Sequence, residues 1–161
     1  MSNDNQIQKL ADRLACQDVM ASYARGVDER DFDMYRACFA DDVKVVGFGD
    51  SEVNGADAWT EYVVGALDNF TKTQHMLGPQ LATINGDTAD CRTDVQAWHL
   101  MKEPANQTLT LWATYMSQMQ RTDAGWKITR HELVSRATST CLLYTSPSPR
   151  DATLSRMPSS A

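Results

Sequence analysis

The hydrophobic period of the chain changes near residue 70, and this change constrains the fold more than any other feature. Residues 5–25 carry apolar side chains at helical spacing, and shorter helical segments follow at 32–39 and 56–67. A β-branched run at 43–48 indicates a strand between them. Beyond residue 70 come five strand-like runs, at 71–77, 81–84, 88–101, 108–121 and 126–134. Helices followed by a long antiparallel meander predict an α+β fold.

Short polar motifs mark the ends of several elements. Asn85-Gly86-Asp87 and Asp123-Ala124-Gly125 are hairpin signals between successive strands. Asp31 precedes the second helical segment, where a carboxylate can cap the first turn. Gly26 lies near the end of the first helical segment, so we expect Asp28 just past that helix.

Alternation along residues 88–101 separates two faces of the predicted sheet. Small and apolar side chains on one face favour an inward orientation for Val95, Ala97 and His99. On the neighbouring strand, Tyr115 is a candidate pocket residue. The opposite face carries Arg92, Asp94, Trp98 and Leu100. Three helices cannot cover this outer face fully, so we expect the chain to form a homo-oligomer, a dimer or a trimer.

Composition argues against several classes of protein. The net charge of −6, without a basic cluster, disfavours nucleic acid as a partner. The polar N-terminus and the lack of a long apolar run predict a soluble, cytoplasmic protein without a membrane span. Four cysteines without C-x-x-C spacing suggest buried free thiols, and three scattered histidines give little support for a metal site. No Gly-rich phosphate loop or nucleophile elbow is present, so we expect no cofactor.

The segment from Cys141 to Ala161 differs abruptly from the rest of the chain. It is rich in proline and serine and has no helix or strand period. CLLYTSPSPRD resembles the conceptual translation of a transposase sequencing adapter, and the last seven residues resemble that of a flow-cell adapter. We therefore predict one native domain at 1–140 and treat 141–161 as a non-native segment.

Few residues in the domain could carry chemistry. Asp28 follows Gly26-Val27 within an acidic run, and His75 lies in a predicted strand among apolar neighbours. His99 ends the inward-facing stripe, and Tyr23 lies on the first helix, five residues before Asp28. His131, flanked by Arg130 and Glu132, is predicted to lie on the surface. Proton transfer by side chains alone is the chemistry that these residues suit.

Motifs spread over about residues 6–135 resemble the SnoaL-like branch of the nuclear-transport-factor-2-like superfamily. They are LADRLACQD, YARGVD, DFD, CFADDV, TQHMLG, NGDTA, AWH and RTDAGWKI. The resemblance implies a cone-shaped α+β barrel, with three N-terminal helices on a curved mixed or antiparallel sheet that encloses a pocket. Because this fold hosts many functions, it constrains the reaction much less.

Three lyases of that superfamily carry residues similar to those here. Gly-Val-Asp at 26–28 and the later histidine resemble hexachlorocyclohexane dehydrochlorinase, which has an aspartate–histidine dyad. Thr-Gln-His-x-x-Gly at 73–78 resembles scytalone dehydratase, whose aspartate and two histidines match Asp28, His75 and His99; its pocket tyrosine is replaced by Val27. Bile-acid 7α-dehydratase pairs a tyrosine with an aspartate five residues on, like Tyr23 and Asp28.

The resemblance implies a cofactor-independent lyase, a dehydratase or dehydrohalogenase, acting on a small, largely apolar cyclic molecule. Asp28, His75, His99 and Tyr23 would be catalytic, and Val27, Val95, Ala97 and Tyr115 would contact the substrate. Alternatives within the fold are an isomerase or cyclase, and an epoxide hydrolase using Arg92 and Asp94. A further alternative is a non-catalytic ligand-binding or assembly module like the small subunit of ring-hydroxylating dioxygenases.

Overall fold

The helices and strands follow the predicted order, with one further short strand at Val53–Asn54, and give the predicted α+β class. The computed structural model describes residues 3–143. The elements are α1 Asn3–Glu29, α2 Phe32–Arg36, β1 Phe39–Val46, β2 Val53–Asn54, α3 Ala56–Leu67, β3 Phe70–Leu77, β4 Leu81–Asn85, β5 Thr88–Met101, β6 Gln107–Thr122 and β7 Gly125–Leu142.

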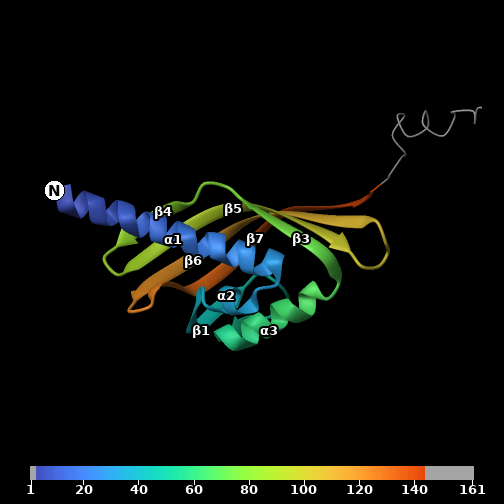
Figure 1. Ribbon diagram of the computed structural model, residues 1–161, viewed down its shortest axis with the longest axis horizontal. Coiled ribbons are helices and arrows are strands. Elements are labelled where there is room, and N and C mark those ends of the chain that lie inside the picture. Colours follow the sequence, from blue (N-terminus) through green and yellow to red (C-terminus); the bar gives the residue numbers. More distant parts are fainter. Residues whose placement is uncertain (1–2, 144–161) are drawn as a thin grey trace, which may run out of the picture.

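One mixed sheet of seven strands forms the wall of the molecule. Its order is β2-β1-β7-β6-β5-β3, with β4 also paired to β5. The β1–β7 pair is parallel and the other pairs are antiparallel. Figure 1 shows α1 lying along the curved sheet, with α2 and α3 gathered beside β1. The helices therefore close one side of the sheet, and nothing within residues 3–143 covers its other face.

Strand β5 shows why the core lies between the sheet and the helices. Its exposed and buried residues alternate from Thr88 to Ala97. Val95 and Ala97 are buried, whereas Arg92 and Asp94 are exposed. The predicted inward and outward faces of this strand are therefore confirmed, and so are the two hairpins, which turn at Gly86 and Gly125 with positive φ.

Helix α1 is longer than predicted at its C-terminal end. It continues through Gly26 to Glu29, so Asp28 lies in its last turn rather than beyond it. Glycine is required at position 26 for a packing reason, since a Cβ there would lie 2.8 Å from the backbone nitrogen of Tyr35. The close approach of α2 to α1, not the end of the helix, explains this glycine. Asp31 caps α2 as predicted, and its side chain accepts from Met34 N–H at 3.0 Å.

Other element ends also differ from the predictions. Helix α2 ends at Arg36, and β1 begins at Phe39, earlier than predicted. Strand β7 continues to Leu142, two residues past the predicted end of the native domain, and pairs along its length with β6. The remainder of the segment with the adapter-like sequence, from 144 onward, lies outside the described residues.

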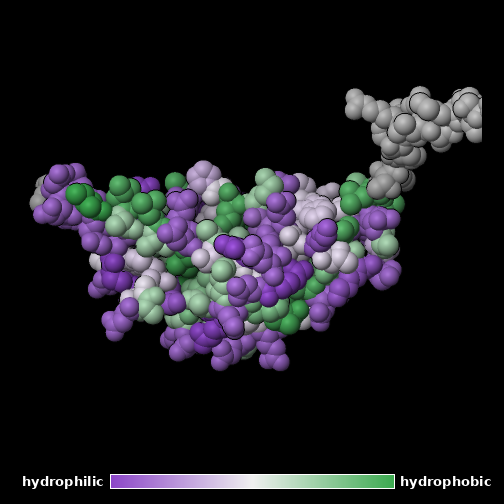
Figure 2. Space-filling model, in the orientation of Figure 1, coloured by the Kyte–Doolittle hydropathy of each residue, from purple (hydrophilic) through white to green (hydrophobic). Residues whose placement is uncertain are grey.

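Three of the four cysteines are buried free thiols as expected, whereas Cys141 is exposed near the end of β7. The N-terminal part of α1 extends past the sheet (Figure 1), and Figure 2 shows hydrophobic side chains along it. Those exposed there are Ile7, Leu10 and Leu14. No helix within residues 3–143 has the length and apolar character needed to cross a membrane.

Candidate active site

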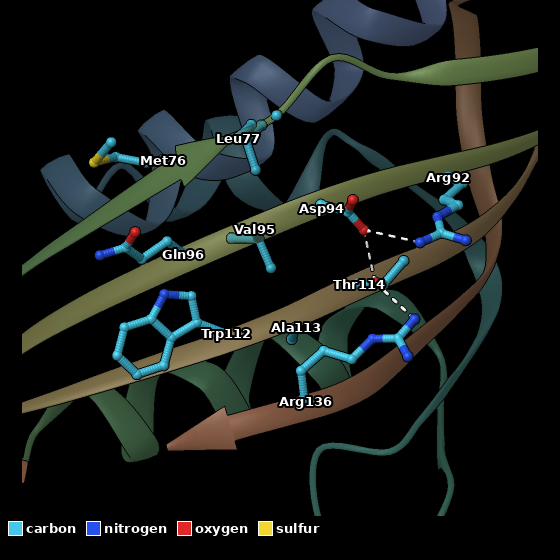
Figure 3. Close-up of a pocket in the computed structure, with 11 residues that line it drawn as sticks. Met76, Leu77, Arg92, Asp94, Val95, Gln96, Trp112, Ala113, Thr114 and Arg136 are labelled. Carbon is cyan, nitrogen blue, oxygen red and sulfur yellow. Dashed lines mark hydrogen bonds and ion pairs between the residues drawn. The ribbon is translucent and has the colours of Figure 1, made fainter. Parts of the chain in front are cut away.

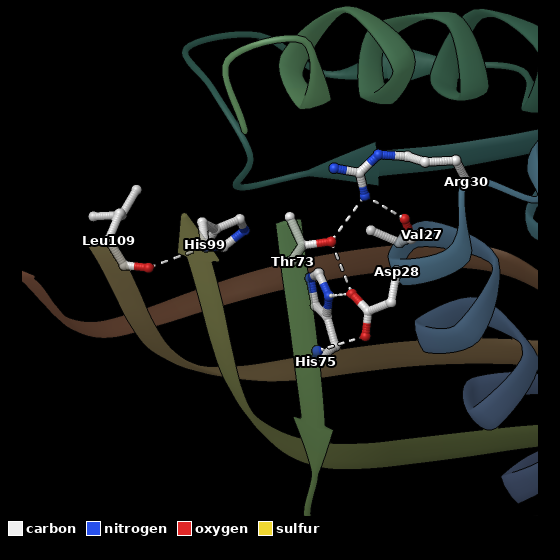
Figure 4. A network of polar contacts seen from close by, with 7 residues as sticks. All are labelled: Val27, Asp28, Arg30, Thr73, His75, His99 and Leu109. Atoms are coloured by element: carbon white, nitrogen blue, oxygen red, sulfur yellow. Dashed lines mark hydrogen bonds and ion pairs between the residues drawn. The ribbon is translucent and has the colours of Figure 1, made fainter. Parts of the chain in front are cut away.

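The last turn of α1 and the middle of β3 bring Asp28 and His75 together (Figure 4). Nδ1 of His75 lies 2.8 Å from Oδ1 of Asp28. The backbone N–H of His75 donates to Oδ2 of the same carboxylate at 2.7 Å. The two side chains are only 8% and 20% exposed. Two residues proposed from the sequence as a pair are thus in direct contact and largely shielded from solvent.

The carboxylate of Asp28 is held by a third donor. The hydroxyl of Thr73, two residues before His75 on β3, donates to Oδ1 at 2.9 Å. Burial, the largest single influence, acts to raise the pKa of Asp28, but the hydrogen bonds from His75 and Thr73 outweigh it and lower the pKa. Asp28 is therefore an anion at neutral pH, fixed in position from two sides.

Arg30 supports this arrangement from the loop after α1. Its guanidinium donates to the carbonyl of Val27 at 2.6 Å and to the hydroxyl of Thr73 at 2.8 Å. Because Thr73 accepts from Arg30, its own proton is directed to Asp28. Arg30 has a φ of 61°, an uncommon conformation for a residue other than glycine. Thr73 belongs to the Thr-Gln-His-x-x-Gly motif, but neither it nor Arg30 was predicted as a site residue.

The contact with Asp28 defines the chemical state of His75. A carboxylate only accepts, so Nδ1 of His75 carries the shared proton. In the neutral ring, Nε2 is then left with a lone pair. The ring of His75 meets the ring of His99 edge-on, with centroids 5.7 Å apart. A basic nitrogen is thereby available beside a second imidazole.

The surroundings of His99 keep its ring neutral. Burial lowers its pKa, and the neighbouring His75 acts in the same direction. Its Nδ1 lies 3.3 Å from the carbonyl of Leu109, which can only accept (Figure 4). The proton of the neutral ring is therefore on Nδ1, and Nε2 of His99 is an acceptor. This state makes His99 a poor proton donor.

An apolar cavity of about 170 Å³ adjoins both histidines. Its wall includes Val27, Ala97 and Tyr115, three of the four residues expected to contact a substrate. Val95 does not line it and is buried in the core instead. Val95 lies farther along the sheet than the site. It pairs with Leu77 at the end of β3, whereas Ala97 pairs with His75.

Tyr23 also lines the cavity, and its ring is almost completely buried. It packs against Tyr35 and Tyr115, with centroid distances of 4.9 Å and 5.3 Å. Burial raises the pKa of Tyr23 well above its usual value. Tyr23 therefore keeps its proton at neutral pH and can donate a hydrogen bond.

His131 is fully buried, so the prediction of a surface position was wrong. It lies on β7, between β1 and β6, paired with Val45 and Ser117. Its Nδ1 is 2.9 Å from the hydroxyl of Ser117, and burial lowers its pKa to about 3. Its charged neighbours Arg130 and Glu132 lie on the other face of the strand. Alternation along β7 could therefore have predicted that His131 is buried.

Arg92 and Asp94 lie outside the cavity, on the uncovered face of the sheet (Figure 3). Asp94 accepts from Arg92 at 3.3 Å and from Thr114 at 2.7 Å. Arg136 in turn donates to Thr114. These groups line an open hollow together with Trp112 and Met76. Within residues 3–143, no three His, Cys, Asp or Glu side chains converge in a way that could hold a metal ion.

Comparison with known proteins identifies the family. The model of the SnoaL-like domain matches residues 8–132, and the chain belongs to that family. Uncharacterised proteins of Mycobacterium tuberculosis and Mycobacterium bovis are 28% identical to it over 128 residues, which is 77% of this chain and 85% of theirs.

Solved structures share the fold. A putative aromatic ring hydroxylase from Novosphingobium aromaticivorans is 29% identical, with a TM-score of 0.75 over 82% of this chain and 94% of its own. A putative scytalone dehydratase from the same organism is 21% identical, with a TM-score of 0.76 over 89% and 94%. A hexachlorocyclohexane dehydrochlorinase from Novosphingobium barchaimii is 20% identical, with a TM-score of 0.78 over 88% and 99%.

Proposed function

We propose that this protein is a cofactor-independent lyase that eliminates water or a halide from a small cyclic substrate. The observation that carries the proposal is the contact of His75 Nδ1 with a fixed Asp28 carboxylate beside an apolar cavity. A neutral imidazole held in one tautomer by a buried carboxylate is suited to general-base catalysis.

The reaction begins at Nε2 of His75. This nitrogen takes a proton from a carbon of the substrate, and the electron pair of that C–H bond forms a C=C bond. The bond to the leaving group breaks and its electron pair departs with hydroxide or halide. Asp28, in contact with Nδ1, stabilises the imidazolium as it forms. A base positioned in this way contributes about 10²–10⁴-fold to a rate.

A departing hydroxide needs a proton or a hydrogen bond. His99 is neutral and presents an acceptor, so it is unsuited to this step. Tyr23 lines the same cavity, and its raised pKa keeps it protonated. We assign Tyr23 as the donor to the leaving oxygen. A hydrogen bond in such a buried site is stronger than in water.

The size of the cavity limits the substrate. Cavities of roughly 150 Å³ lined by apolar side chains bind a molecule such as benzene. The volume here is about 170 Å³, and the wall is largely aromatic and aliphatic. A single six-membered ring with small substituents is the substrate class that fits.

Two solved structures of the same fold are named as a scytalone dehydratase and a hexachlorocyclohexane dehydrochlorinase, and both names describe eliminations. At this low identity the similarity shows only a shared fold. The eliminations in their names agree with the chemistry that Asp28 and His75 can perform. An epoxide hydrolase using Arg92 and Asp94 is not supported, because both side chains are exposed on the outer face.

A panel of halogenated and β-hydroxylated six-membered rings tests the proposal. The wild-type protein should convert at least one of them to the unsaturated product, detected by NMR together with halide release where it applies. His75→Gln should lose this turnover, whereas Gln74→Asn on the same strand should keep it. Equal turnover by wild-type and His75→Gln proteins would refute the role of the dyad, and migration of a double bond without loss of a group would indicate an isomerase instead.

A further inference from the structure

We propose that Tyr35 and Trp59 form a hydrogen-bonding subsite in the same cavity, which selects cyclic ligands that carry a carbonyl or similar oxygen acceptor. The assignment of this subsite to a substrate rests on the proposed function. The binding of an oxygen acceptor does not, because it requires no proton transfer by His75.

The two side chains come from the helical wall of the cavity. Tyr35 lies on α2 and Trp59 near the start of α3, whereas His75 and His99 lie on β3 and β5. Tyr35 packs on Tyr23 and Phe39, and Trp59 packs on Phe48 and Tyr62. A ligand that fills the cavity therefore meets the histidines on one wall and these two rings on another.

Both polar atoms in question are buried without a hydrogen-bond partner. Tyr35 and Trp59 are 0% exposed, and within the described residues neither Tyr35 Oη nor Trp59 Nε1 has a partner. Buried polar groups in proteins are nearly always satisfied, so such a pair at the wall of one cavity calls for an explanation. An oxygen acceptor on the ligand supplies the missing partner for both.

Both unpartnered groups can act as hydrogen-bond donors. Burial is the main cause that raises the pKa of Tyr35 well above its usual value, so the hydroxyl stays protonated. The indole N–H of Trp59 can only donate. Phenol and indole donors at the wall of one cavity are suited to a carbonyl or developing enolate oxygen.

Tyr62 provides a contrast within the same cavity wall. Its hydroxyl donates to the carbonyl of Phe48 at 2.9 Å and is therefore already satisfied. Loss of the Tyr62 hydroxyl should leave ligand selection unchanged, whereas loss of the Tyr35 hydroxyl should not. The pair of tyrosines gives a matched control for the subsite.

Calorimetric binding of two probes of similar shape tests the proposal. Cyclohexanone carries the acceptor, and methylenecyclohexane replaces the oxygen with a CH₂ group. Tyr35→Phe should weaken cyclohexanone binding by up to about tenfold and leave methylenecyclohexane binding unchanged, since a net hydrogen bond has about that effect. Tyr62→Phe should change neither. The same pattern should persist in an Asp28→Asn background, which separates this subsite from the dyad.

Stability gives a second readout. Because the Tyr35 hydroxyl has no partner, Tyr35→Phe should leave the thermal midpoint unchanged or raise it, whereas a hydroxyl with a structural role would lower it. A third measurement needs no variant: the carbonyl stretch of bound cyclohexanone should shift to lower frequency than in an apolar solvent. Failure of the wild-type protein to bind cyclohexanone, equal weakening of both probes by Tyr35→Phe, or an unshifted carbonyl stretch would overturn the proposal.

Discussion

Asp28 and His75 are joined twice although they are 47 positions apart, once through the imidazole and once through the backbone of the strand. The side-chain contact sets the tautomer of the ring. The backbone contact fixes the carboxylate relative to β3, so that the helix end and the strand keep their spacing. A change that loosens either contact should leave Nε2 of His75 less well positioned to act as a base.

Thr73 is the residue through which Arg30 acts on this pair. Thr73→Val removes the hydroxyl that donates to Asp28 and accepts from Arg30, with little change of shape. We expect turnover to fall by about tenfold, because a hydrogen bond to a charged group is lost. The pKa of Asp28 should rise, since that bond is one of those that lower it. Turnover and a ¹³C NMR titration of Asp28 measure the two effects, and Thr73→Ser should preserve both properties.

His131 makes the folded protein sensitive to acid. Burial lowers its pKa from 6.5 to about 3, so below pH 6.5 the unfolded chain binds a proton here that the folded chain does not. Its contribution to stability is therefore complete above pH 6.5 and is lost as the pH falls toward 3, by about 1.4 kcal/mol per pH unit. Urea unfolding at several pH values measures this slope. His131→Gln should flatten it, and an unchanged slope in that variant would show that other groups cause the acid sensitivity.

Two glycine substitutions should have opposite effects on stability. In Gly26→Ala the new Cβ would meet backbone atoms of Asp31 and Tyr35 at 2.8–3.0 Å, so α1 and α2 must move apart. We expect a loss of roughly 1–3 kcal/mol. Gly65 lies in α3 with nothing within 4 Å of a Cβ, so Gly65→Ala should stabilise the protein by about 0.5–1 kcal/mol. Thermal unfolding of both variants is the measurement, and a Gly26→Ala protein as stable as wild type would contradict the packing argument.

The uncovered face of the sheet predicts self-association. Large apolar side chains on it are exposed, among them Met76, Trp112 and Met116. We expect a molar mass in solution that is a multiple of 18.0 kDa, and we expect Trp112→Glu to reduce it to the monomer. Light scattering with size-exclusion chromatography measures this. Leu10→Gln, on the exposed part of α1, should leave the mass unchanged; dissociation by that variant instead would place the interface on the helix.

Local patterns predicted much of the fold. The bounds of α3 and β5 agree with the prediction to the residue. Each segment has a clear hydrophobic period and is flanked by turn residues or polar residues on both sides. Both hairpins and the cap by Asp31 were also correct. The predicted end of α1 was wrong. Gly26 allows the close approach of α2, and the sequence cannot distinguish such a glycine from one that ends a helix.

The site was predictable only where sequence motifs identify it. Asp28, His75 and His99 could be grouped by resemblance, and the structure brings them together. The supporting roles of Arg30 and Thr73 and the unpartnered groups of Tyr35 and Trp59 could not be predicted, because they depend on contacts between distant elements. His131 was misplaced for a different reason, since its charged neighbours were given more weight than the alternation that puts it on the buried face of β7.

Turnover by Asp28→Asn protein is the direct test of the dyad. An asparagine keeps the size of the side chain but loses the charge, so it no longer stabilises the imidazolium that forms on His75. Relative to wild type, we predict a fall in kcat of about three to four orders of magnitude on any substrate that the panel identifies, with an unchanged thermal midpoint within a few degrees. Asp33→Asn, in the same acidic run but exposed, should remain fully active. A folded Asp28→Asn protein with wild-type kcat would contradict the account.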